Sequence, residues 1–286
     1  MTWIRHAFLL LVPLVPLVQL RIDQRLEPAR AREDALYLWS GPQVRRLCPG
    51  FENLMADVYW LRTVQYFGSQ RAFQSTQRYE LLLPLIDITT TLDPRLEIAY
   101  RYGGTFLSEP RPMGAGRPRD GVALMERGVA ANPRSWRLRQ DLGFARYFFL
   151  RDPQGAADDA LAASRLPGAP SYLEPLAALF LSKGGHRDSS REIWRRLYEQ
   201  AEDGPIKDNA LFHLRYLSAL DEVDRLNSAV DEFARRASHR PDNLAQLHSL
   251  GLLRRSPVDP LGVPFAYDRE SGKASIARAS PLWHPP

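Results

Sequence analysis

Histidine and cysteine are the side chains best suited to bind a metal ion or to act as nucleophiles. The only cysteine is Cys48, which excludes an internal disulfide framework and a cysteine-cluster metal site. The histidines show neither the HExxH motif nor another close pair that would bring two imidazoles to one ion. We therefore expect no metal site and interpret the histidines as solvent-facing or core residues. They are His6, His186, His213, His239, His248 and His284.

Acidic pairs and glycine motifs are the remaining candidates for catalysis. We expect the pairs Asp158-Asp159 and Asp221-Glu222 at helix starts, where the helix dipole stabilises negative charge without any acid–base role. The Gly-Ala-Gly run at Gly114 is isolated in a loop, and there is no Gly-x-Ser-x-Gly elbow, P-loop or dinucleotide fingerprint. We accordingly expect a protein that is not an enzyme and that takes no cofactor and no small-molecule substrate.

Amino-acid composition restricts which fold class and which class of partner are expected. The chain has 286 residues, of which 44% are hydrophobic, so a substantial core is possible. Leucine and alanine recur at helical periods and alternating β-branched runs are nearly absent, which predicts an all-α fold. The 38 basic and 33 acidic residues give a net charge of only +5. Because the arginines are spread along predicted helices, nothing favours nucleic-acid binding.

A repeated helical hairpin is the predicted element that positions everything else. The stretch Leu96–Pro133 contains two amphipathic helices, joined by a loop rich in glycine and proline. Gly103, Gly121 and Gly128 fall on the helix faces, where small residues allow two helix backbones to approach closely. The same plan recurs because prolines fall roughly 35–39 residues apart. These prolines are Pro94, Pro133, Pro170, Pro205 and Pro241.

The spacing of small and aromatic residues on these helices resembles the tetratricopeptide repeat (TPR) family, whose period is about 34 residues. The resemblance implies a TPR-like α-solenoid, a right-handed superhelix of stacked hairpins with a concave groove, over residues 53–241. The individual hairpins are expected from 53–94 through 206–241. The best matches to the second-helix pattern are Ala229, Phe233 and Pro241, then Ser190, Trp194 and Leu197, and more loosely Ala156, Ala160 and Ala163.

Four further segments flank the predicted repeats. Residues 1–20 carry an apolar run from Ala7 to Val18, which we interpret as a single membrane anchor, with a cleaved signal peptide or a soluble helix as open alternatives. Residues 21–52 form a connector, residues 242–255 a capping helix, and residues 256–286 a hairpin and loose tail. Asp259–Lys273 is similar to a hairpin near the C-terminus of type II secretion major pseudopilins.

The TPR resemblance also implies which residues line the groove. The Lys and Asn pair with which some TPR domains clamp a peptide carboxylate is missing. An aromatic groove suits an amphipathic helix or an extended peptide, although the same rings could instead contact the next hairpin. The candidate groove residues are Tyr100, Arg137, Gln140, Phe144, Tyr147, Phe148, Tyr172 and Lys183.

Together these features predict a membrane-tethered TPR scaffold that binds a protein segment. Its expected role is assembly or secretion of a bacterial envelope complex, with the anchor, residues 3–20, holding it beside membrane partners. The alternative is a permanent accessory subunit of a larger membrane enzyme or of a pilus-like or secretion machine. The side of the membrane on which the body lies stays open, because the arginines after residue 20 and the basic start of the segment favour opposite sides.

Overall fold

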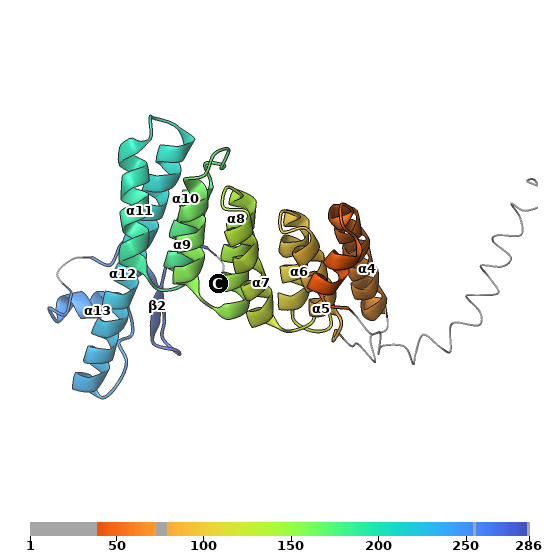
Figure 1. The fold of residues 1–286 in the computed structure, drawn as a ribbon. Helices are drawn as coiled ribbons and strands as arrows, with labels where there is room; N and C mark the ends of the chain where they lie inside the picture. Colours follow the sequence, from red (N-terminus) through yellow and green to blue (C-terminus); the bar gives the residue numbers. More distant parts are fainter. Residues whose placement is uncertain (1–38, 73–78, 254–255, 285–286) are drawn as a thin grey trace, which may run out of the picture. The chain divides into compact units, whose positions relative to one another are not determined.

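The computed structural model describes residues 39–72, 79–253 and 256–284, and its secondary structure is almost entirely helical (Figure 1). The prediction of an all-α fold is therefore confirmed. The chain divides into two compact units, Met1–Asn132 and Pro133–Pro286. The predicted anchor, residues 1–20, and the first part of the connector lie outside the described residues.

In its described part, residues 39–72 and 79–132, the N-terminal unit contains two helical hairpins and one short helix. α4 pairs with α5, α6 pairs with α7, and α5 contacts α6, so the two hairpins stack. The short helix α3 packs on α5. The bounds are α3 Gly41–Leu47, α4 Glu52–Ala72, α5 Leu82–Leu92, α6 Glu97–Ser108 and α7 Pro118–Ala131.

Glycines bring α6 and α7 into close contact. A Cβ atom on Gly121 would lie 2.5 Å from the carbonyl oxygen of Gly104, and one on Gly128 would lie 2.6 Å from Cγ of Tyr100. Neither contact is sterically possible, so only glycine permits this helix crossing. The predicted packing role of Gly121 and Gly128 is confirmed.

The C-terminal unit continues with helices that contact one another in chain order. α8 packs on α9, α9 on α10, α10 on α11 and α11 on α12. The alanines Ala156, Ala160 and Ala177 pack with Trp194 in the main core. The bounds are α8 Trp136–Ala145, η1 (a π-helical turn) Arg146–Leu150, α9 Pro153–Ser164, α10 Leu173–Lys183, α11 Arg187–Gln200, α12 Pro205–Ala237, α13 Leu244–Ser249, β1 Ala266–Asp268 and β2 Lys273–Ser275.

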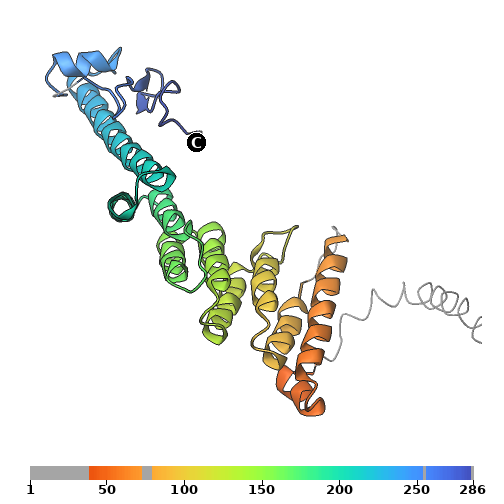
Figure 2. The ribbon, with the colours of Figure 1, turned by 90° about the horizontal axis from the view of Figure 1, so that it is seen from above.

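The last predicted hairpin, 206–241, is wrong, because α12 is one uninterrupted helix of 33 residues (Figure 2). The interval from Pro205 to Pro241 has the length of a repeat, but no glycine or proline divides it. Good helix formers such as Leu, Ala, Glu and Arg fill its centre, and nothing there stops helix propagation.

The C-terminal segment packs against α12. β1 and β2 pair antiparallel, with Tyr267 opposite Ala274, and the amide of Ala274 donates a 2.8 Å hydrogen bond to Oδ1 of Asn227 on α12. Leu282 is fully buried in the cluster that includes Leu226 of α12. The predicted loose tail is therefore wrong as far as residue 284, since an apolar side chain holds it in the core.

No helix within residues 39–72, 79–253 and 256–284 is both long enough and apolar enough to cross a membrane.

Candidate partner-binding face

Two stripes of side chains at helical spacing form one surface on α8 and α10. We call this surface the α8–α10 face. Residues three or four positions apart lie on the same side of a helix, so each stripe occupies a single side. The side chains are Arg137, Gln140, Phe144 and Phe148 from α8 and η1, and Tyr172, Leu176, Leu179 and Lys183 from α10 and its N-cap.

Direct contacts hold the two helices in register. The hydroxyl of Tyr172 donates a 3.0 Å hydrogen bond to Oε1 of Gln140. Farther along, Phe144 meets Phe180 edge to face at 5.7 Å between ring centroids, and Tyr147 stacks on the same ring at 4.6 Å. Because the beginnings of both helices meet and their later turns also meet, α8 and α10 run in the same direction.

The aromatic rings of this face are partly open to solvent. The exposed fraction is 55% for Phe148, 48% for Tyr172 and 36% for Leu179. Phe144 and Tyr147 are half-buried and pack against the core. Of the two alternatives drawn from the sequence, contact with the next hairpin holds for the inner rings, Phe144 and Tyr147. The outer residues, Phe148, Tyr172 and Leu179, are exposed to solvent.

A π-helical turn and a partly buried ion pair fix the end of α8. Nε of Arg146 lies 2.9 Å from Oδ2 of Asp159 on α9, and both side chains are largely buried, with exposed fractions of 25% and 13%. Asp152 adds a second carboxylate 3.5 Å from Nη1 of Arg146. Because a buried arginine must keep its partner, this pair anchors η1 on α9 and holds its orientation.

The charges on the α8–α10 face are positive and lie toward its two ends. Arg137 is exposed in the first turn of α8, 4.4 Å above the ring of Trp136. Lys183 is exposed in the last turn of α10. Since the helices run in the same direction, a cation stands at each end of an apolar centre.

Tyr100 does not belong to this surface, and its placement in the groove is wrong. Only 4% of its surface is exposed, and its ring fills the space left by Gly128 where α6 crosses α7. Burial raises the pKa of its hydroxyl above the ordinary value. The TPR register predicts an outward side chain at this position. It does not include the effect of Gly128 on α7, whose lack of a side chain makes room for the ring.

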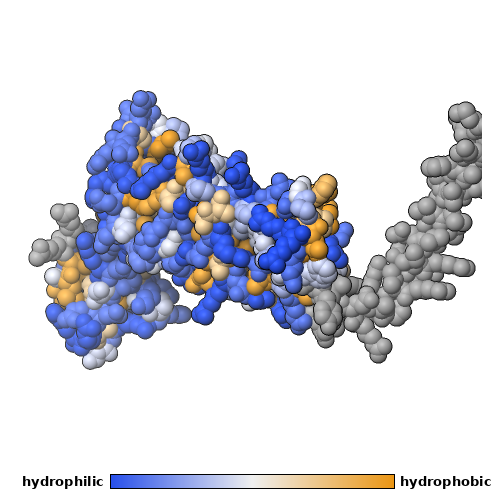
Figure 3. Space-filling model, in the orientation of Figure 1, coloured by the Kyte–Doolittle hydropathy of each residue, from blue (hydrophilic) through white to orange (hydrophobic). Residues whose placement is uncertain are grey.

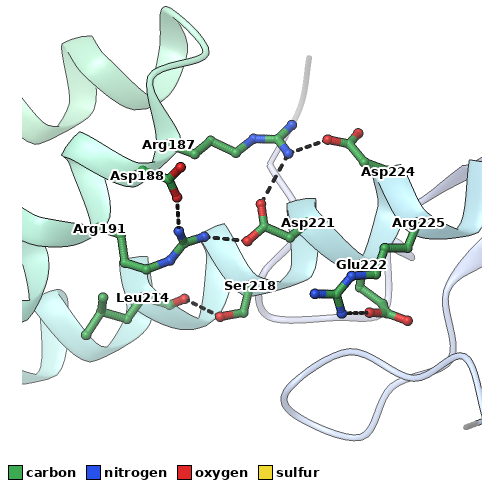
Figure 4. Close-up of polar contacts among 9 residues, drawn as sticks. All are labelled: Arg187, Asp188, Arg191, Leu214, Ser218, Asp221, Glu222, Asp224 and Arg225. Atoms are coloured by element: carbon green, nitrogen blue, oxygen red, sulfur yellow. Dashed lines mark hydrogen bonds and ion pairs between the residues drawn. The ribbon is translucent and has the colours of Figure 1, made fainter.

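Both acidic pairs lie inside helices, so their predicted position at helix starts is wrong. Asp159 lies within α9, where it pairs with Arg146. Asp221 lies within α12 and accepts hydrogen bonds from Arg187 and Arg191 of α11 (Figure 4). Asp224 also pairs with Arg187. These carboxylates join neighbouring helices, which is a structural role.

His213 is a half-buried histidine that packs on the core. Its ring stacks on Trp194 with 4.2 Å between centroids. Burial first, and then nearby His284, lower its pKa from 6.5 to about 4. Within the described part of the chain, no group of three His, Cys, Asp or Glu side chains could hold a metal ion.

Leu176 and Leu179 are the face residues that the sequence reasoning missed. Both were detectable, since they follow Tyr172 by four and seven residues and so share its side of the helix.

Searches against protein-family profiles, curated proteins and solved structures gave no significant match to this chain.

Proposed function

We propose that this protein is a non-catalytic scaffold that binds a segment of another protein on its α8–α10 face. The observation that carries the proposal is the exposure of Phe148, Tyr172 and Leu179 on two helices whose register is fixed by inter-helix contacts. Aromatic side chains on a rigid support lose little entropy on binding and dominate the energetics of many interfaces.

The chemistry of the face defines the segment it would take. An amphipathic helix or extended peptide would place apolar side chains against Phe144, Phe148 and Leu179. Acidic residues flanking those side chains would meet Arg137 and Lys183. Such charges mainly steer and orient the partner, while the apolar contacts supply most of the affinity.

Helices packed in chain order within each unit support a TPR-like solenoid as the finer description of the fold. In such folds each hairpin buries its apolar side on its neighbours, which leaves one helix of every pair to line a binding surface. We further propose that residues 3–20 tether the protein to a bacterial membrane, where it assists assembly or secretion of an envelope complex. A tether raises the local concentration of a weak binding face beside membrane partners.

The test compares the proteins that co-purify with the full-length chain from gently solubilised membranes. In one variant, Phe148→Ser and Leu179→Ser together remove exposed apolar side chains from the face and leave the buried core residues unchanged. The matched control is Ile206→Ser, which changes an apolar residue of α12 that is 54% exposed.

We expect the face variant to lose a defined partner by about tenfold or more, as for side chains at the centre of an interface. The control should retain that partner, and both variants should keep the helicity of the parent chain. Equal capture by all three chains would contradict the proposal.

A further inference from the structure

Helix α4 is apolar on two opposite sides. Its inner side packs into the N-terminal unit, where Phe67 stacks on Phe106 of α6 with 3.9 Å between ring centroids. On the outer side Leu54 is 58% exposed, Val58 39% and Leu61 60%. Figure 3 shows apolar surface over this helix. A helix with apolar residues on both sides is typical of one that is covered on both sides.

The outer residues follow the spacing of a two-stranded coiled coil. Phe51, Leu54, Val58 and Leu61 are separated by three, four and three residues, as at positions a, d, a and d of a heptad. Phe51, immediately before α4, is 63% exposed. In a parallel coiled coil, a β-branched residue such as Val58 at a, with leucine at the d positions, favours two strands over three or four. Gln65 occupies the next a position, so the apolar seam covers two heptads.

The flanking charges distinguish parallel from antiparallel pairing. Asp57 lies at position g and Arg62 at position e, on opposite flanks of the seam, and both are exposed. In a parallel pair, position g faces position e of the other helix five residues later. Asp57 would therefore meet Arg62 of the partner subunit, and the symmetric contact would form as well. In an antiparallel pair g faces g and e faces e. Asp57 would then lie on the same flank as Asp57 of the partner subunit, and the two negative charges would repel each other.

We infer that α4 pairs in parallel with α4 of a second copy of this chain, along the seam Phe51, Leu54, Val58 and Leu61. In a parallel pair both copies of α4 begin at the same end, which suits two chains held in one membrane. A seam of two heptads is short, and tethering both chains to one membrane would favour it by raising their effective concentration. The tethering argument rests on the membrane anchor proposed above, whereas the pairing itself does not depend on the α8–α10 face.

Disulfide trapping in the full-length chain, reconstituted into lipid vesicles at high lipid excess, tests the pairing. In a Cys48→Ser background, Val58→Cys places thiols at facing a positions of the proposed pair. A small adjustment there would bring the two Cβ atoms to the separation of about 4 Å that a disulfide requires. Asn53→Cys is the control, because Asn53 is exposed on α4 outside the seam. We expect rapid covalent dimerisation at position 58 and little at position 53. Equal trapping at both positions would mean random collisions only, and no trapping at position 58 would mean that residues 1–38, the lipid surface or another protein covers the stripe; both results overturn the inference.

Charge reversal tests the direction. Asp57→Arg or Arg62→Asp alone places like charges across both flanks of a parallel pair, which we expect to lower trapping at position 58 by roughly threefold to tenfold. The double exchange, Asp57→Arg with Arg62→Asp, should restore it. If the double exchange traps no better than the single variants, the pairing is not parallel.

Discussion

Helices α6 and α8 occupy equivalent places in two successive hairpins, yet they use their aromatic side chains in opposite ways. Tyr100 of α6 is buried against α7, whereas Phe144 of α8 is half-buried and meets Phe180 of α10 edge to face. The position of the glycine explains the difference. In the first hairpin Gly128 of α7 makes room for a ring from α6.

Glycine also brings the two backbones of the second hairpin together. A Cβ atom on Gly143 of α8 would lie 3.0 Å from the carbonyl oxygen of Ala156 on α9. Gly104 and Gly121 bring α6 and α7 comparably close, so close approach alone does not exclude a ring. The difference is that α9 has no glycine after Gly155 to make room for one. A missing side chain on the facing helix therefore decides whether an aromatic ring enters the core at the crossing.

The largest effect on stability should come from Tyr100→Ala. Removing a buried ring leaves a cavity between α6 and α7, and such substitutions cost about 3–5 kcal/mol. Hydrogen exchange of the α6 and α7 amides in the full-length chain would report the loss locally. If Tyr100→Ala left these amides as protected as in the parent chain, the assignment of Tyr100 to the core would be wrong.

A smaller loss is expected from breaking the anchor of η1. Arg146→Met leaves the largely buried Asp159 without its cation, which we expect to destabilise the C-terminal unit by about 2–3 kcal/mol. Adding Asp159→Leu should recover much of that loss, since apolar pairs often replace buried ion pairs without cost. Denaturant unfolding of the two variants measures both changes. The absence of any recovery in the double variant would count against a direct pair.

His213 predicts a pH dependence confined to the C-terminal unit. Its pKa is about 4 in the folded chain and 6.5 as an ordinary histidine, so the unfolded chain binds the proton more readily. The stabilising effect of the neutral ring is complete above pH 6.5 and is lost as the pH falls toward 4. Because the ring is only partly buried, we expect a loss of about 1–2 kcal/mol.

The measurement is unfolding at pH 7 and pH 4.5, with His213→Phe as the control. The phenyl ring keeps the stacking on Trp194 but cannot take up a proton. The difference in pH dependence between the two chains isolates His213 from the other titrating groups. Identical pH dependence would refute this assignment.

The smallest effect on stability should come from removing an exposed ring of the α8–α10 face. Phe148→Ser removes a ring that is 55% exposed, and we expect a change of about 0.5 kcal/mol or less in unfolding free energy. Thermal unfolding measures this change. A loss as large as that of Tyr100→Ala would mean that Phe148 supports the core.

Local patterns predicted the helices and the first four hairpins well, because the prolines and glycine-rich loops stop helices whatever the tertiary context. The spacing of prolines gave a wrong prediction between Pro205 and Pro241, because this interval has the length of a repeat but contains one long helix. For the candidate site, helical spacing grouped Gln140, Phe144 and Phe148 correctly. Tyr100 was misplaced because its burial depends on Gly128, which lies on another helix. Pairs such as Arg146 and Asp159 could not be predicted, since they depend on which helices meet.

The central claim is that the α8–α10 face binds a partner, whereas Tyr102, an exposed aromatic residue of α6, does not. It is tested most directly by a photoreactive phenylalanine analogue at position 148 or, as the matched control, at Tyr102, which lies on α6 and is 50% exposed. After irradiation of membranes containing the full-length chain, the account predicts a discrete protein adduct from position 148 and none from position 102. No adduct from position 148, or the same adduct from both positions, would contradict it.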